Sequence, residues 1–179
     1  MLLALAIAAI VAGGSLPSAC SYDPAILKLG VDAFDQDLSG GWRALAERPE
    51  CVEVAADLVH KYREHQQSMI NILYWHEGQL RAGRGENDAA IAPFELSRQP
   101  GDERGWNEYV DATIAFLKHD KPALLAARAK LSRRPPGPEF IESNGQRISL
   151  PPGPMNLAVV DKLIKHYGQT YNDAYDSSD

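Results

Sequence analysis

Cysteine is rare in this sequence: the 179-residue chain contains two, Cys20 and Cys51. Two cysteines cannot form a four-cysteine zinc site, and the chain also lacks a His-Glu-x-x-His motif. Its five histidines are scattered, and His60 and His65 do not share one face of a helix. We therefore expect neither a metal ion nor a cofactor.

The sequence also lacks the motifs that identify common enzyme classes. There is no Gly-x-Ser-x-Gly nucleophile motif. The glycines of residues 82–88 (AGRGEND) follow a predicted helix rather than a strand, unlike those of a phosphate-binding loop. Neither cysteine lies in a recognisable nucleophile motif. We expect that the protein is not an enzyme; the alternative is a catalytic site assembled from distant residues.

Positive charge is in deficit, with 18 Lys and Arg against 24 Asp and Glu and a net charge of −6. Nucleic-acid binding depends on neutralising phosphates, and docking to anionic membranes depends on basic clusters, so both are disfavoured. An apolar content of 45% is ordinary for a folded soluble protein. The length suits one domain, which we place at residues 20–179.

The first 22 residues contain no charged side chain. Within residues 1–19, the apolar run from Leu2 to Ala12 is too short to span a bilayer comfortably, and small residues follow it. This layout is typical of a secretory signal peptide. It predicts a periplasmic or secreted protein of the bacterial envelope, with no membrane-spanning segment in the mature chain. A buried N-terminal helix is the alternative.

Export changes how the two cysteines are interpreted. In an oxidising compartment a lone pair usually forms a disulfide, and a bond between Cys20 and Cys51 would pin the N-terminal segment onto the helices that follow. Lipid attachment to Cys20 is an alternative, because residues 18–20 resemble the end of a lipoprotein signal, although Pro17 stands where that motif has an aliphatic residue. Two free thiols are the third alternative.

Residues 72–99 predict two short helices joined by a tight turn. Gly83 and Gly85 are expected to end the first helix, because glycine readily takes the left-handed conformation. Asn87 and Asp88 are expected to cap the second helix. Elsewhere, Asp23-Pro24 and Asp120 signal further helix starts.

This stretch resembles a tetratricopeptide repeat (TPR). The resemblance rests on small residues, a turn glycine and an aromatic at the family's positions: Gly78, Gly85, Ala90, Phe94 and Ser97. Three positions depart from the pattern, where the family has leucine, tyrosine and proline: Glu77, Arg81 and Asp102. Such repeats recur every 34 residues, and this step leads from Gly78 to Ala44 and Ala112, which are also small.

The resemblance implies an all-α fold, a right-handed α-α superhelix of about three TPR-like hairpins with capping helices at both ends. We place the repeats at residues 37–70, 71–104 and 105–138. Asn144-Gly145 is the strongest short signal for a β-hairpin turn, so residues 139–179 should hold a small hairpin and then a helix. A generic helical bundle with coincidental spacing is the alternative.

In this family the first helix of each repeat lines a concave groove. The resemblance therefore nominates seven residues as groove candidates: Ile72, Trp75, Gln79, Trp106, Tyr109, Thr113 and Phe116. Aromatic side chains there would grip a peptide or a partner helix; the alternative is that Trp75 and Trp106 pack between helices. We predict a non-catalytic scaffold that binds a protein or peptide. The alternative is an immunity or inhibitor protein that neutralises an envelope-targeted toxin or hydrolase.

Overall fold

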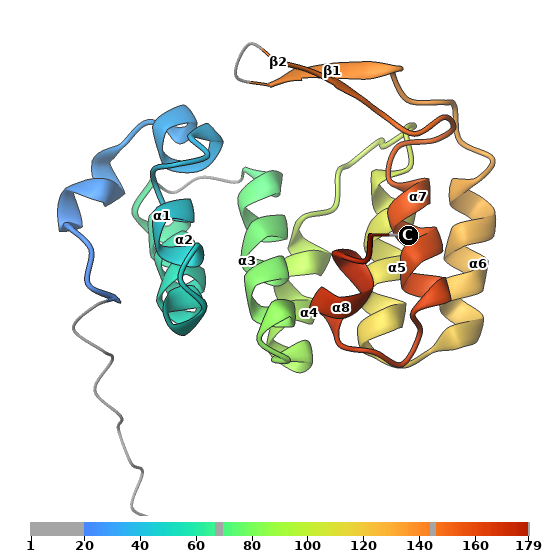
Figure 1. The fold of residues 1–179 in the computed structure, drawn as a ribbon, viewed down its shortest axis with the longest axis horizontal. Coiled ribbons are helices and arrows are strands. Elements are labelled where there is room, and N and C mark those ends of the chain that lie inside the picture. Colours follow the sequence, from blue (N-terminus) through green and yellow to red (C-terminus); the bar gives the residue numbers. More distant parts are fainter. Residues whose placement is uncertain (1–19, 67–69, 144–145, 179) are drawn as a thin grey trace, which may run out of the picture.

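The computed structural model describes residues 20–66, 70–143 and 146–178 (Figure 1). The predicted signal peptide and the Asn144-Gly145 turn lie outside these residues. The described part is mostly helical with one small antiparallel sheet, which confirms the predicted fold class at this level.

The chain forms short and regular helices followed by the hairpin and two C-terminal helices. In order, the helices are the 3-10 helix η2 (Pro24–Lys28), the π-helix η3 (Asp32–Gln36), α1 (Arg43–Ala46), the 3-10 helix η4 (Pro49–Cys51), α2 (Val52–Gln66), α3 (Asn71–Gly83), α4 (Asn87–Leu96), α5 (Trp106–Leu117), α6 (Lys121–Leu131), α7 (Leu157–Lys165) and α8 (Tyr171–Tyr175). The strands are β1 (Phe140–Ser143) and β2 (Gln146–Ser149), which place Ile141 opposite Ile148.

The helices pack largely in sequence order. Helix α3 packs against α2 on one side and α4 on the other, and α5 packs against α6 (Figure 1). Each span predicted as a repeat contains two α-helices, and the first span also contains the 3-10 helix η4. Helices α7 and α8 do not extend the row, because α7 contacts α5 and α6 while α8 contacts α3 and α7.

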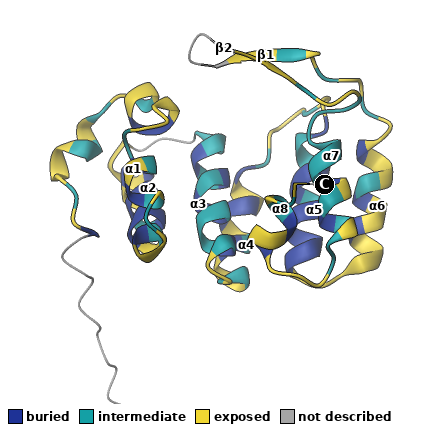
Figure 2. Ribbon diagram, in the orientation of Figure 1, coloured by how far each residue is buried: buried dark blue, intermediate teal, exposed yellow. Residues whose placement is uncertain are grey.

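Two hydrophobic clusters meet at α3. Leu73 belongs to the N-terminal cluster, which also contains Phe34 and Tyr62. Trp75 belongs to the C-terminal cluster, which α4 to α8 complete. Ile72 packs against both, and the buried faces follow these two interfaces in Figure 2. Helix α3 thus joins the two halves of the core.

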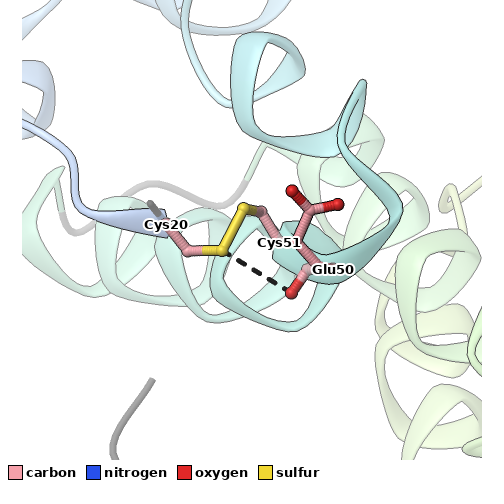
Figure 3. Close-up of a disulfide and its surroundings, with 3 residues drawn as sticks. All are labelled: Cys20, Glu50 and Cys51. Carbon is pink, nitrogen blue, oxygen red and sulfur yellow. Dashed lines mark hydrogen bonds between the residues drawn. A yellow bond between two sulfur atoms is a disulfide. The ribbon is translucent and has the colours of Figure 1, made fainter. Parts of the chain in front are cut away.

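Cys20 and Cys51 form a disulfide with a Cα–Cα distance of 5.2 Å (Figure 3), which confirms the predicted pairing. A sulfur held in this bond cannot also carry a lipid. Cys20 Sγ lies 3.6 Å from the Glu50 carbonyl oxygen. Because a disulfide sulfur carries no hydrogen, this is a close contact rather than a hydrogen bond. The bond holds the segment before η2 against the start of α2.

The turn between α3 and α4 follows the predicted glycine chemistry but not the predicted cap. Helix α3 ends at Gly83, and Gly85 takes the left-handed conformation with φ of +78°. The Asn87 and Asp88 cap prediction was wrong, because α4 is capped at Glu86, without a side-chain hydrogen bond. Asn87 is already inside the first turn, and its Nδ2 donates to the Leu117 carbonyl oxygen at 3.5 Å.

Gly78 allows α3 and α4 to approach closely. A Cβ atom at this position would lie 2.7 Å from the ring of Phe94, which is fully buried. Real Cβ contacts are longer than this, so a larger residue would force the ring or the helix to move.

We expect Gly78→Ala to lower the free energy of unfolding. Overpacking costs about 1–3 kcal/mol, against a gain of up to about 1 kcal/mol from the helix propensity of alanine. Urea unfolding monitored by circular dichroism measures the change. Gly30→Ala is the control, because no atom lies within 4 Å of a Cβ there. An equal effect of the two substitutions would contradict the argument.

Replacing both cysteines by serine should lower the free energy of unfolding by about 3–4 kcal/mol, because the unfolded chain regains the entropy of an open loop. The two cysteines are 31 residues apart. Chemical unfolding with and without a reducing agent measures this loss. The reducing agent should destabilise the wild type by a similar amount and leave the double variant unchanged.

Candidate functional site

The seven groove candidates fall into a buried set and a partly exposed set. Four are buried in the core: Trp75, Tyr109, Thr113 and Phe116. They offer no surface to a partner, so the groove prediction was wrong for them. Three keep some exposure: Ile72, Gln79 and Trp106. For Trp75 the alternative of packing between helices holds.

Trp75 is the centre of an aromatic cluster that joins three helices. Its ring lies 4.6 Å from that of Phe94, 4.9 Å from that of Trp106 and 4.5 Å from that of Tyr109. Trp106 also donates from Nε1 to the Ser97 carbonyl oxygen at 2.7 Å. Tilted and edge-on aromatic pairs of this kind stabilise a core beyond the area they bury. The cluster is structural, and Trp106 alone reaches its surface.

The C-terminal segment covers part of the predicted groove. Tyr171 of α8 is buried, its hydroxyl lies 3.5 Å from Gln79 Nε2 of α3, and its ring stacks on Tyr175. Burial raises the pKa of the phenols of Tyr109 and Tyr171 well above the usual value. Both therefore stay protonated at neutral pH and act as packing groups. The face that the resemblance assigns to a ligand is partly occupied by α8.

Two hollows remain beside the partly exposed candidates. The larger, about 500 Å³, lies between the α4–α5 turn and the start of α7, and its walls include Trp106 and Met155. The smaller, about 260 Å³, lies between α1, α3 and α8, and its walls include Gln79 and His76. We call them the Trp106 cleft and the His76 hollow.

A buried carboxylate stands behind the His76 hollow. Asp35, in the π-helix η3, is 0% exposed. Its Oδ1 accepts a hydrogen bond from Trp42 Nε1 at 2.8 Å and lies 2.7 Å from His76 Nδ1. Arg43 Nε donates to the Asp35 backbone oxygen at 2.8 Å. The carboxylate thereby fixes the rings of Trp42 and His76.

The charge state of Asp35 determines the role of His76. Burial alone would raise the pKa of the Asp35 carboxyl, but the hydrogen bonds and charges of His76, Trp42 and Arg43 hold this pKa below its usual value. An ionised carboxylate only accepts hydrogen bonds. His76 must therefore donate from Nδ1, and its Nε2 is left for the hollow, as in sites where a carboxylate orients an imidazole.

Two departures from the repeat pattern form a second polar cluster. Glu77 is buried and pairs with Arg63 of α2, while Arg81 Nε donates to Glu77 Oε1 at 3.1 Å. Arg81 Nη2 also donates to Asp57 of α2 at 3.1 Å. Because each charge has an opposite partner, the burial cost is offset. This cluster ties α2 to α3 and faces neither hollow.

Sequence reasoning missed Asp35 and its contact with His76. Asp35 and His76 are 41 residues apart, and no local spacing connects them. The pairing of Glu77 with Arg81 was open to prediction, since i,i+4 residues are neighbours on a helix.

Within the described ranges, no group of three or more His, Cys, Asp or Glu side chains is placed to hold a metal ion. No helix in the same part of the chain has the length and apolar character needed to cross a membrane. Comparison with protein-family models, with curated proteins and with solved structures gives no match.

Asp35 gives a pH-dependent prediction. Because its pKa is lower in the folded than in the unfolded chain, its ionisation stabilises the fold above the unfolded pKa of about 3.9. This contribution is lost as the pH falls through the folded pKa. Asp35→Asn should cost about 1–3 kcal/mol at pH 6, and its difference from the wild type should shrink below about pH 4.

Urea unfolding of the two proteins from pH 3 to pH 7 measures this difference. Asp32→Asn is the matched control, because Asp32 lies in the same π-helix but is exposed. A difference between Asp35→Asn and the wild type that stays constant over the whole range would exclude a role of the Asp35 charge.

Proposed function

We propose that the chain is a non-catalytic scaffold of the bacterial envelope that binds a protein or peptide partner. In this proposal the paired helices form a right-handed, TPR-like superhelix, and the partner contacts the β-hairpin and the Trp106 cleft. We call this the arm surface and define it by four residues: Ile141, Ile148, Trp106 and Met155.

The exposed β-hairpin is the observation that carries the proposal. Ile141 and Ile148 lie opposite each other and remain 40% and 44% exposed. The hairpin projects from the connection between α6 and α7, beyond the ends of the helices (Figure 1). The strand residues whose burial is described, 140–142 and 147–149, are intermediate or exposed (Figure 2). A lone two-stranded hairpin is marginally stable in water. A partner that covers the isoleucine pair, or adds a strand to an edge, would stabilise it.

The Trp106 cleft adjoins the base of this hairpin. The hairpin is closed by hydrogen bonds from the Leu150 N–H to the Glu139 oxygen and from the Gly137 N–H to the Gly153 oxygen. A Cβ on Gly137 would lie 2.8 Å from Met155 Cγ, and Met155 also lines the cleft. Tryptophan and methionine at the edge of an open cleft suit anchoring of a partner side chain.

Two further observations support the proposal. Each 34-residue span holds a pair of α-helices, as the TPR resemblance leads one to expect, although the first span also contains η4 and its α1 has only four residues. A buried disulfide is typical of proteins in oxidising compartments, which agrees with export.

Site-specific photo-crosslinking tests the arm surface. A photoreactive amino acid at Ile148 should give a discrete protein adduct in cells of the organism that encodes the chain. The same amino acid at Leu125 of α6, which is 45% exposed, is the matched control and should give none. Equal adducts at the two positions, or none at Ile148, would refute the proposed surface.

The captured partner then allows a quantitative test. The combined Ile141→Ser and Ile148→Ser substitutions should weaken its binding by about thirtyfold or more, as expected for an anchoring apolar pair. Leu125→Ser should leave binding unchanged. A single tight partner with toxin or hydrolase activity would identify the chain as an immunity or inhibitor protein instead.

A further inference from the structure

We propose that the partner binds the arm surface as an extended strand, which pairs with the outer edge of β2. The inference rests on the proposed function and deepens it, because it states which edge of the hairpin is used and which kind of segment binds there.

The register of the hairpin determines which backbone groups face outward. The Leu150 N–H donates to the Glu139 carbonyl oxygen at 2.9 Å, and Ile141 lies opposite Ile148. Hydrogen-bonded and non-hydrogen-bonded pairs alternate along an antiparallel ladder, and residues of a non-hydrogen-bonded pair direct their N–H and C=O groups away from the neighbouring strand. Each strand therefore presents two such residues at its outer edge: Phe140 and Glu142 in β1, and Arg147 and Ser149 in β2.

Neither edge is covered within the described part of the chain. The sheet there has two strands, and none of these four residues has a backbone hydrogen bond to another segment. All four are intermediate or exposed. An unpaired edge is a template for a further strand, and a third strand would give the sheet the size that independent stability requires.

The side chains of the hairpin favour a strand over a helix as the bound segment. A helix needs a groove, whereas the two strands form a ribbon (Figure 1). On one face Ile141 and Ile148 are exposed. On the other face the Arg147 guanidinium lies over the ring of Phe140, with 3.4 Å between Cζ and the ring centroid. An added strand would extend the isoleucine face without displacing this contact.

Continuity with the Trp106 cleft selects the edge of β2. Residues 150–154 connect β2 to Met155 and Asn156, which both line the cleft, whereas the described residues that lead into β1 do not. The edge of β2 is also short, because Pro151, at the next alternate position, has no N–H. Two edge residues offer few hydrogen bonds, so a strand there needs a second contact, which the cleft supplies.

This geometry describes the partner segment. Its residue directly opposite Ile148 would occupy a non-hydrogen-bonded position, where the side chains of two strands approach most closely. A β-branched or aromatic residue at this position would enlarge the apolar face. We therefore expect an extended segment with one such residue and, a few residues away, a side chain that enters the Trp106 cleft.

A crosslinking map of the two strands tests the inference. A short diazirine amino acid is placed at one position at a time in cells of the organism that encodes the chain. A strand on the edge of β2 should give the same adduct at Arg147, Ile148 and Ser149, which lie on both faces of one strand. Phe140 and Glu142 are the matched controls and should give none, because they are the register partners of Ser149 and Arg147.

Proline at the edge is the second test. Arg147→Pro removes an outward N–H at a position where an edge strand tolerates proline. It should lower the yield of the adduct at Ile148 by about fivefold, the typical value of one hydrogen bond. Arg147→Gln loses the same charge but keeps the N–H, so its adduct should be unchanged. A nuclear Overhauser effect between the Ile141 and Ile148 side chains shows that the hairpin persists in each variant.

The outcomes separate this inference from the proposed function. Adducts at Ile141 and Ile148 alone would mean that the partner covers the isoleucine face, which would overturn the strand and leave the arm surface standing. Equal adducts on β1 and β2, an equal loss in the two Arg147 variants, or an adduct formed only with a second copy of the chain would also overturn the inference. No adduct at any position would refute both the strand and the arm surface.

Discussion

The packing of α3 between two partners is the constraint on which the rest of the structure depends. One side of this helix gives Leu73 to the N-terminal cluster, and the other gives Trp75 to the C-terminal cluster. The two interfaces differ in chemistry: Gly78 admits the ring of Phe94 toward α4, whereas Glu77 pairs with Arg63 toward α2. The interface of α3 with α2 is charged, whereas its interface with α4 is close-packed and apolar. This difference would keep α2 and α4 from exchanging places, since a buried charge without its partner is costly.

Local chemistry made much of this fold predictable. Gly85 takes the left-handed conformation, and Asp23 and Asp120 accept hydrogen bonds from the Ala25 and Ala123 N–H groups at the helix starts they were expected to cap. The hairpin and the disulfide also follow from short-range or counting rules. The docking of α7 and α8 could not be predicted by such rules, because it depends on contacts such as that of Gln79 with Tyr171, 92 residues apart. The apolar periodicity of one helix does not indicate which distant segment of the chain will pack against it.

The candidate site was predictable only in part, for the same reason. Repeat position nominated Trp75 and Tyr109, yet the aromatic cluster and the arrival of α8 bury both. Gln79 was found by position, but the sequence did not predict that its Nε2 donates to the Tyr171 hydroxyl. The contact of His76 with Asp35 could not be predicted from local spacing, because η3 brings Asp35 into place from 41 residues away.

The His76 hollow has walls from α1, α3 and α8, and this has an energetic consequence. Helix α8 is short, and Tyr171 and Ala174 are the residues it buries. Any ligand that contacted both α3 and α8 in this hollow would bind only while α8 is docked. Its binding would therefore shift the chain toward the docked state, by the difference between its affinities for the two states. The coupling is reciprocal. Any substitution that loosens the packing of Tyr171 should therefore weaken such a ligand, because Tyr171 is one of the two residues that α8 buries.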